Sequence, residues 1–102
     1  MKILAKWTIK EYHQMIEAGI LDDRQVELLA GEIIEMSPEK PIHYYITRQD
    51  VKYLEKLFNN LAEIRFNGPI TLADSEPELD IAIVRLPANR YKIHHPYAED
   101  IF

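Results

Sequence analysis

The spacing of apolar residues predicts a first helix that begins at Thr8 and ends near Ala18. Thr8 and Glu11 match the capping box, in which each side chain accepts a hydrogen bond from the other residue's backbone N–H. Apolar residues then recur at three- and four-residue spacing on one face of the predicted helix: Tyr12, Met15 and Ile16. Gly19 follows at the position where a left-handed residue commonly ends a helix.

The next apolar stretch, Val26 to Met36, predicts a β-hairpin centred on Gly31. Ala30 is not the Asn or Asp that favours a two-residue turn, so we expect a slightly longer loop with Gly31 at a left-handed bulge position. Pro41 suits the first turn of a second helix, which we expect to reach Asn59 or Asn60.

Three strands are predicted after the second helix. Glu63 to Phe66 alternates polar and apolar residues, Gly68-Pro69 suggests a turn, and Ile70 to Leu72 then forms a short strand. Ile81 to Val84 is the most continuously apolar strand candidate and is expected to be central. The predicted order is α-β-β-α-β-β-β, an α+β fold with a small mixed or antiparallel sheet flanked by helices, in one domain spanning residues 1–102.

The amino-acid composition excludes several kinds of site and partner. The 102 residues include 47% hydrophobic and 28% charged residues, which is typical of a globular domain. The absence of cysteine excludes disulfides, thiolate metal sites and cysteine nucleophiles. No apolar run suits a membrane helix and the first residues do not resemble a secretory signal, so we expect a cytoplasmic protein without a membrane partner. The net charge of -5 argues against a general polyanion binder, so any contact with nucleic acid must be local.

Four carboxylates within seven residues form the most informative cluster: Asp74, Glu76, Glu78 and Asp80. Such a cluster repels itself unless solvent or a cation intervenes. Asp80 leads directly into the apolar strand, where its oxygens would be held rigidly enough to bind a hard cation such as Mg²⁺. The alternative interpretation is a solvated acidic loop.

Glu27 and His43 are further candidates, each with a structural alternative. Glu27 interrupts apolar residues in the predicted hairpin, so it needs a partner unless strand alternation points it to solvent. His43 lies at the start of the second helix, where it could belong to a site or only make a hydrogen bond at the helix entry.

A short basic stretch stands out on this acidic chain. It contains Arg85, Arg90 and Lys92, followed by two histidines and interleaved with tyrosines. Bases and aromatic rings together can hold phosphate and stack on nucleobases, although a solvated basic face is the alternative. No serine nucleophile elbow, phosphate-binding glycine loop or dinucleotide fingerprint is present, so we expect no small-molecule cofactor.

Several motifs occur in an order and spacing that span most of the chain. They are Trp7-Thr8…Glu11-Tyr12…Met15…Ala18-Gly19-Ile20, then Val26-Glu27-Leu28…Gly31-Glu32-Ile33-Ile34-Glu35-Met36-Ser37-Pro38, then His43, and finally Glu76-Pro77-Glu78-Leu79-Asp80-Ile81-Ala82-Ile83-Val84. Together they resemble the Uma-two family of restriction-endonuclease-like proteins, which is placed in the PD-(D/E)xK nuclease superfamily. The resemblance implies a restriction-endonuclease-like fold, in which helices flank a mixed central sheet, and acidic residues that hold Mg²⁺ or Mn²⁺ against a phosphodiester of DNA.

The resemblance also assigns roles to single residues. Asp80 matches the metal-binding aspartate, Glu27 matches a glutamate that supports the metal or its water, and His43 matches a recurrent family histidine at the site. Leu79 stands where the family usually has proline, which changes the backbone before the strand and leaves the aspartate in place.

Family members continue into a further strand with a second site glutamate and a helix with a site lysine, which this sequence does not contain. We therefore expect a truncated domain that is weak or inactive as a nuclease on its own. Its unpaired strand edge would favour a homodimer in which two copies complete each other's sheet. The alternative function is a non-catalytic homodimeric or nucleic-acid-binding module that uses Arg85, Arg90 and Lys92.

Overall fold

The computed structural model describes residues 1–102, and its first helix, α1 (Ile9–Glu17), begins and ends as predicted. The Thr8 hydroxyl accepts the Glu11 N–H at 3.1 Å, and the Glu11 carboxylate accepts the Thr8 N–H at 2.9 Å. Ala18 caps the other end, and Gly19 follows with a φ of +78°. The capping box and the left-handed glycine therefore set both ends of α1 from local sequence alone.

The hairpin forms with a tighter turn than expected. Strands β1 (Val26–Leu29) and β2 (Glu32–Glu35) are antiparallel, and the last residue of β1 pairs with the first residue of β2. Ala30 and Gly31 both have positive φ, at 48° and 79°, as in a type I′ turn. The longer bulged loop predicted from Ala30 is wrong. Tertiary hydrogen bonds hold the turn, because the Gly31 N–H donates to the Asp74 carbonyl at 3.0 Å.

The second half of the chain forms a long helix and a second antiparallel pair. Helix α2 (Pro41–Phe58) starts at its proline as predicted. Strand β3 (Glu63–Pro69) pairs with β4 (Glu78–Val84), so Gly68-Pro69 ends a strand and does not form the predicted turn. The predicted separate strand Ile70 to Leu72 does not form, and the observed order is α-β-β-α-β-β followed by two short 3-10 helices.

Local hydrogen bonds explain why the predicted strand Ile70 to Leu72 does not form. The N–H groups of Ile70 and Leu72 donate to the carbonyls of Pro77 and Ser75, which closes this segment into the loop before β4. Only Thr71 makes a strand-like bridge, to a residue near the C-terminus. The α+β class is nevertheless confirmed, with two helices and two small antiparallel sheets.

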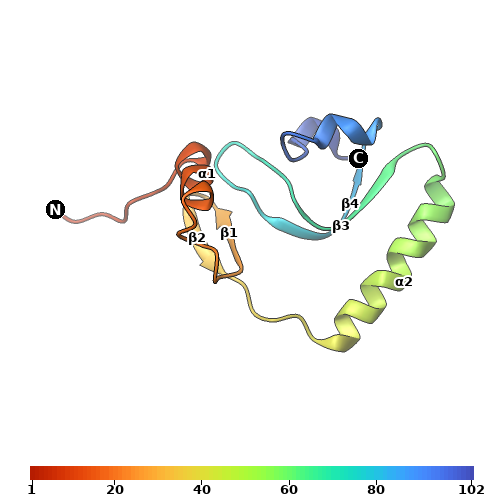
Figure 1. Ribbon diagram of the computed structural model, residues 1–102, viewed down its shortest axis with the longest axis horizontal. Helices are drawn as coiled ribbons and strands as arrows, with labels where there is room; N and C mark the ends of the chain where they lie inside the picture. The colour runs from red at the N-terminus through yellow and green to blue at the C-terminus, as the bar shows by residue number, and fades with distance from the viewer.

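A single segment connects the two sheets. Just before β4, Glu76 bridges to Leu28 of β1, and its N–H donates to the Leu28 carbonyl at 2.7 Å. Figure 1 shows α1 and the hairpin grouped near the N-terminus, α2 at the opposite end, and β3 and β4 between them. The few buried apolar residues follow this path from α1 through both sheets to α2: Tyr12, Leu28, Val51, Ile70, Ala82 and Val84. Neither helix has the length and apolar character needed to cross a membrane.

Candidate metal centre

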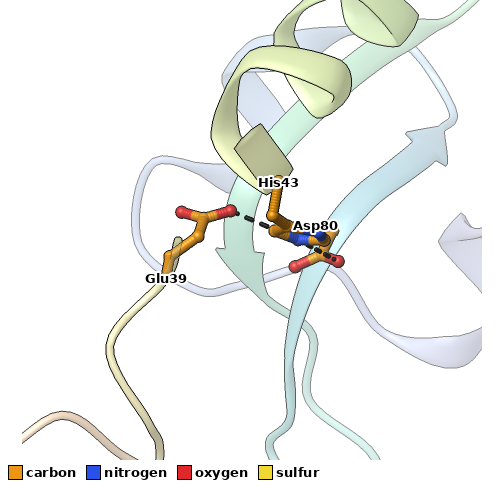
Figure 2. Close-up of side chains that lie close together, drawn as sticks. All are labelled: Glu39, His43 and Asp80. Atoms are coloured by element: carbon orange, nitrogen blue, oxygen red, sulfur yellow. Dashed lines mark hydrogen bonds and ion pairs between the residues drawn. The ribbon is translucent and has the colours of Figure 1, made fainter. Parts of the chain in front are cut away.

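Three side chains from different parts of the chain meet at the start of β4. Asp80 lies on β4, His43 lies in the first turn of α2, and Glu39 lies just before that helix. The His43 Nε2 atom is 3.0 Å from Asp80 Oδ2 and 3.3 Å from Glu39 Oε1, as Figure 2 shows. One potential ligand atom from each residue lies within 4.8 Å of the other two. Two carboxylates and an imidazole therefore face a common point.

The start of α2 carries His43 to this place. Pro41 occupies the first position of the helix, where its fixed φ suits helical geometry. In the next residues, the Tyr44 ring packs edge-on against Phe66 of β3 with ring centroids 5.5 Å apart. Because β3 pairs with β4, this contact places His43 beside Asp80. The helix start and the tertiary packing are both needed to assemble the cluster.

Negative charge is crowded around this point. Burial raises the pKa of Glu78, and the neighbouring carboxylates of Glu27, Asp80 and Glu39 raise it further in that order. The side chains of Asp80 and His43 are 60% and 49% exposed, so a cation can reach them from solvent. They border a cavity of about 250 Å³ lined by Gln25, Met36, Ser37, Glu39, His43, Asn67, Glu78 and Asp80.

The spacing of the ligand atoms can be compared with the shell of a small divalent cation. In an octahedral shell with ligands about 2.1 Å from the ion, adjacent ligands are about 3.0 Å apart and opposite ligands about 4.2 Å apart. The separations from His43, 3.0 and 3.3 Å, are hydrogen-bond or ion-pair distances and are also close to the spacing of adjacent ligands. Carboxylate oxygens suit Mg²⁺ and Mn²⁺, whereas an imidazole nitrogen favours later transition metals such as Zn²⁺. Asp80 and Glu39 are thus the groups that would hold Mg²⁺ or Mn²⁺, with His43 as a third donor.

Glu27 lies beside this cluster and is not one of its three members. Its carboxylate accepts the backbone N–H of Glu78 at 3.0 Å, across the junction between β1 and β4. The half-buried Glu27 therefore has a protein partner, as one of the two sequence interpretations required. This contact is with the strand that carries Asp80. The assignment of Glu27 as a metal ligand stays a prediction.

Glu76, which belongs to the acidic cluster predicted before β4, has different surroundings from Asp80. Glu76 is buried, and its carboxylate lies 2.8 and 2.9 Å from the Nε2 atom of His13 and accepts the Thr71 hydroxyl at 2.7 Å. This group borders a second cavity of about 740 Å³. His13 lies on α1, where its side chain is 43% exposed. The partner lies 63 positions away in the sequence, which helix periodicity cannot detect.

Intramolecular contacts occupy two of the three predicted nucleic-acid-binding residues. The Arg85 guanidinium donates to the Glu99 carbonyl at 3.0 Å and lies over the Phe102 ring at 4.5 Å. Arg90 pairs with the buried Asp100 at 3.3 Å. Lys92 is exposed and borders the larger cavity. Arg85 and Arg90 thus fix the segment after β4, and nucleic-acid binding by the three residues stays a prediction.

Glu39 is the member of the cluster that sequence reasoning missed. It lies four residues before His43, a spacing that brings two side chains together at the start of a helix. That spacing around Pro41 was the available signal. It was hidden because Glu39 lies outside the acidic cluster that precedes β4.

Comparisons with known proteins show a shared fold. The chain is similar to the crystal structure of a "putative nuclease belonging to DUF820" from Anabaena variabilis ATCC 29413, with a TM-score of 0.65 and 19% sequence identity. The alignment covers 76% of this chain and 42% of that protein, so this chain matches less than half of the other protein's length. Neither the comparison with protein-family models nor that with curated proteins gives a match. The α+β arrangement seen here thus corresponds to part of a nuclease-like fold.

Proposed function

We propose that this chain is a metal-dependent nuclease-like domain, whose cluster of Asp80, His43 and Glu39 binds Mg²⁺ or Mn²⁺ next to a phosphodiester of DNA. The observation that carries the proposal is the convergence of these three side chains within 4.8 Å at the start of β4. The shared fold supports it, because the neighbouring structure belongs to DUF820, the Uma2 family that the sequence resembles.

The bound cation would supply the chemistry that the side chains lack, by polarising a phosphoryl oxygen and making water more acidic. Asp80 and Glu39 would provide its oxygen ligands. Thr47 steadies the first turn of α2, because its hydroxyl donates to the His43 carbonyl at 2.8 Å. Glu27 accepts the Glu78 N–H, a bond through which it can position the strand that carries Asp80.

Cleavage by this chain alone is expected to be weak or absent. Hydrolysis of this type needs a base or cation near the attacking water in addition to the metal ligands. No lysine or arginine lines the cavity beside Asp80, and the one imidazole there, His43, is the proposed third metal donor. The fold match covers less than half of the neighbouring protein, so the activity of a whole nuclease is a proposal for this chain.

Metal binding is the first test, because it does not depend on catalytic competence. We expect the chain to bind Mn²⁺ in calorimetry or electron paramagnetic resonance, and Asp80→Asn to weaken binding by about tenfold or more, the usual result of disturbing a metal site. Glu35→Gln is the matched control, because it removes an exposed carboxylate from β2, outside the cluster. Absence of Mn²⁺ binding by the unmodified chain would refute the proposed centre.

The same assay distinguishes the two roles of Glu27. If Glu27 binds the metal, Glu27→Gln should weaken Mn²⁺ binding as much as Asp80→Asn does. If it acts by positioning β4, the loss should be smaller and accompanied by a lower free energy of unfolding, because the bond to the Glu78 N–H weakens.

Plasmid and single-stranded DNA with Mg²⁺ or Mn²⁺ test the function itself. Metal-dependent cleavage that Asp80→Asn abolishes supports the nuclease. Salt-sensitive DNA binding without cleavage supports the non-catalytic module, and alanine substitution of Arg85, Arg90 and Lys92 should then reduce the salt dependence.

A further inference from the structure

The larger cavity, of about 740 Å³, shares no lining residue with the cavity beside Asp80. Its size lies within the range of about 300–1,000 Å³ that is typical of sites for small molecules. Histidine and tyrosine rings and one lysine contribute to its wall: His13, Tyr91, Lys92, His94, His95 and Tyr97. The cavity is therefore a candidate binding site that the proposed metal centre does not use.

Aromatic rings provide a stacking surface on this wall. The rings of His94 and Tyr97 are nearly parallel, with an interplanar angle of 6° and centroids 4.4 Å apart. Tyr91 meets the His94 ring edge-on, with centroids 6.4 Å apart. Tyr97 is 39% exposed, and no second ring of the chain stacks on it. A planar nucleobase can extend such a stack, because stacking needs only the free face of an aromatic ring.

Internal hydrogen bonds determine which histidine nitrogens remain as acceptors. The Nε2 atom of His13 lies 2.8 and 2.9 Å from the carboxylate oxygens of Glu76, which accept hydrogen bonds. The proton of a neutral His13 ring therefore lies on Nε2, and Nδ1 is an acceptor. In the same way, His94 Nδ1 donates to the His95 carbonyl at 2.7 Å, which leaves Nε2 of the neutral His94 ring as an acceptor. Acceptors of this kind suit the amino groups of nucleobases, which are hydrogen-bond donors.

The charges near the cavity suit a single phosphate. Neither Lys92 nor Arg65 takes part in an ion pair of the chain. Lys92 is exposed on the wall, and the Arg65 guanidinium lies over the Tyr91 ring at 5.6 Å, with its Nε atom buried and without a hydrogen-bond partner. Glu17, exposed on the same wall, offsets one of these two positive charges. The remaining charge matches one phosphate group and is too small for a long stretch of DNA backbone.

We propose that this cavity binds one nucleotide of single-stranded DNA, with its base on the Tyr97 ring and its phosphate towards Lys92. The inference rests on the proposed function, which supplies DNA as the class of substrate. The net charge of -5 opposes attraction of a duplex over long distances, whereas one nucleotide needs only this local site. The base must be unpaired, because a base within a duplex is stacked between its neighbours. A free mononucleotide has the same chemistry, and the experiment distinguishes the two sources.

Fluorescence anisotropy of a labelled, short oligodeoxyadenylate tests the cavity. The titration is made in EDTA, which removes divalent cations, so that it does not depend on the metal centre. We expect the unmodified chain to bind the oligonucleotide, and Tyr97→Ala to weaken binding by about fivefold or more, the lower limit for loss of one stacked base. Tyr97→Phe keeps the ring and should bind like the unmodified chain.

The salt dependence of the same titration tests the phosphate contact. Lys92→Ala should lower the slope of log K against log salt by about 0.7, the value for one phosphate of a single strand. Lys52→Ala removes an exposed lysine from α2, away from the cavity wall, and should leave the slope unchanged. An equal effect of the two lysine variants would overturn the contact with Lys92.

The remaining outcomes separate this cavity from the metal centre. Circular dichroism checks that Tyr97→Ala is folded, and this variant should bind Mn²⁺ like the unmodified chain. Oligonucleotide binding in EDTA by a chain that binds no Mn²⁺ would support the cavity and refute the metal-dependent function. No binding by the unmodified chain, or equal binding by Tyr97→Ala and Tyr97→Phe, would overturn the proposal. Deoxyadenosine monophosphate that binds as tightly as the oligonucleotide would overturn the DNA assignment in favour of a free mononucleotide.

Discussion

Removing the imidazole of His13 should destabilise the fold, although this side chain is 43% exposed. In the structure, His13 holds the buried Glu76 at 2.8 and 2.9 Å, and the Glu76 side chain is only 3% exposed. The pair connects α1 to the segment that leads into β4 and Asp80. His13→Ala leaves that carboxylate with the Thr71 hydroxyl as its only side-chain partner.

The expected loss follows from the burial of the two partners. Removing one partner from a fully buried ion pair costs about 3–5 kcal/mol, and a hydrogen bond to a charged group contributes about 1.5–3 kcal/mol. The His13 side chain is 43% exposed, so water can reach the Glu76 carboxylate once the imidazole is removed. We therefore expect His13→Ala to lower the free energy of unfolding by about 1.5–3 kcal/mol, the lower part of that combined range.

A double-mutant cycle with Glu76→Gln isolates the pair from other effects. Urea unfolding followed by the fluorescence of Trp7, the single tryptophan, gives the free energies of all four proteins. We expect a coupling energy of about 1–2 kcal/mol between the two positions. Lys10→Ala is the control for loss of a long side chain from the same helix and should have little effect. A coupling energy near zero, or equal losses for His13→Ala and Lys10→Ala, would refute the reasoning.

Two further predictions concern the turn and the pH dependence of stability. Ala30→Gly should raise the free energy of unfolding by roughly 0.5–1 kcal/mol in urea titrations, because glycine adopts the observed φ of 48° without strain; a loss of stability would contradict the type I′ assignment. Burial lowers the pKa of His95 below its ordinary 6.5, with Glu76 opposing the shift. Because the unfolded chain then binds the proton more readily, stability is greatest above about pH 6.5 and falls as the pH drops through the folded-state pKa. His95→Gln should make urea midpoints less dependent on pH between about 7.5 and 5, and an unchanged slope would count against the burial of His95.

Local sequence signals determine most of the secondary structure. The ends of α1 and the start of α2 can be predicted from Thr8, Glu11, Gly19 and Pro41, because caps and prolines act within one helical turn. Asp80 can also be identified as a candidate ligand from its position before an apolar strand. These features depend on neighbours close in sequence.

Tertiary structure decides the rest, because the interactions concerned join residues far apart in the sequence. The two-residue turn at Ala30 is held by bonds to the segment before β4, which no local pattern contains. The same applies to the burial of Glu76 against His13 and to the bond between Glu27 and the Glu78 N–H. His43 and Glu39 reach Asp80 only because α2 packs on β3. The sequence by itself thus identifies which groups can bind a cation, whereas the packing of α2 and the strands determines which of them meet.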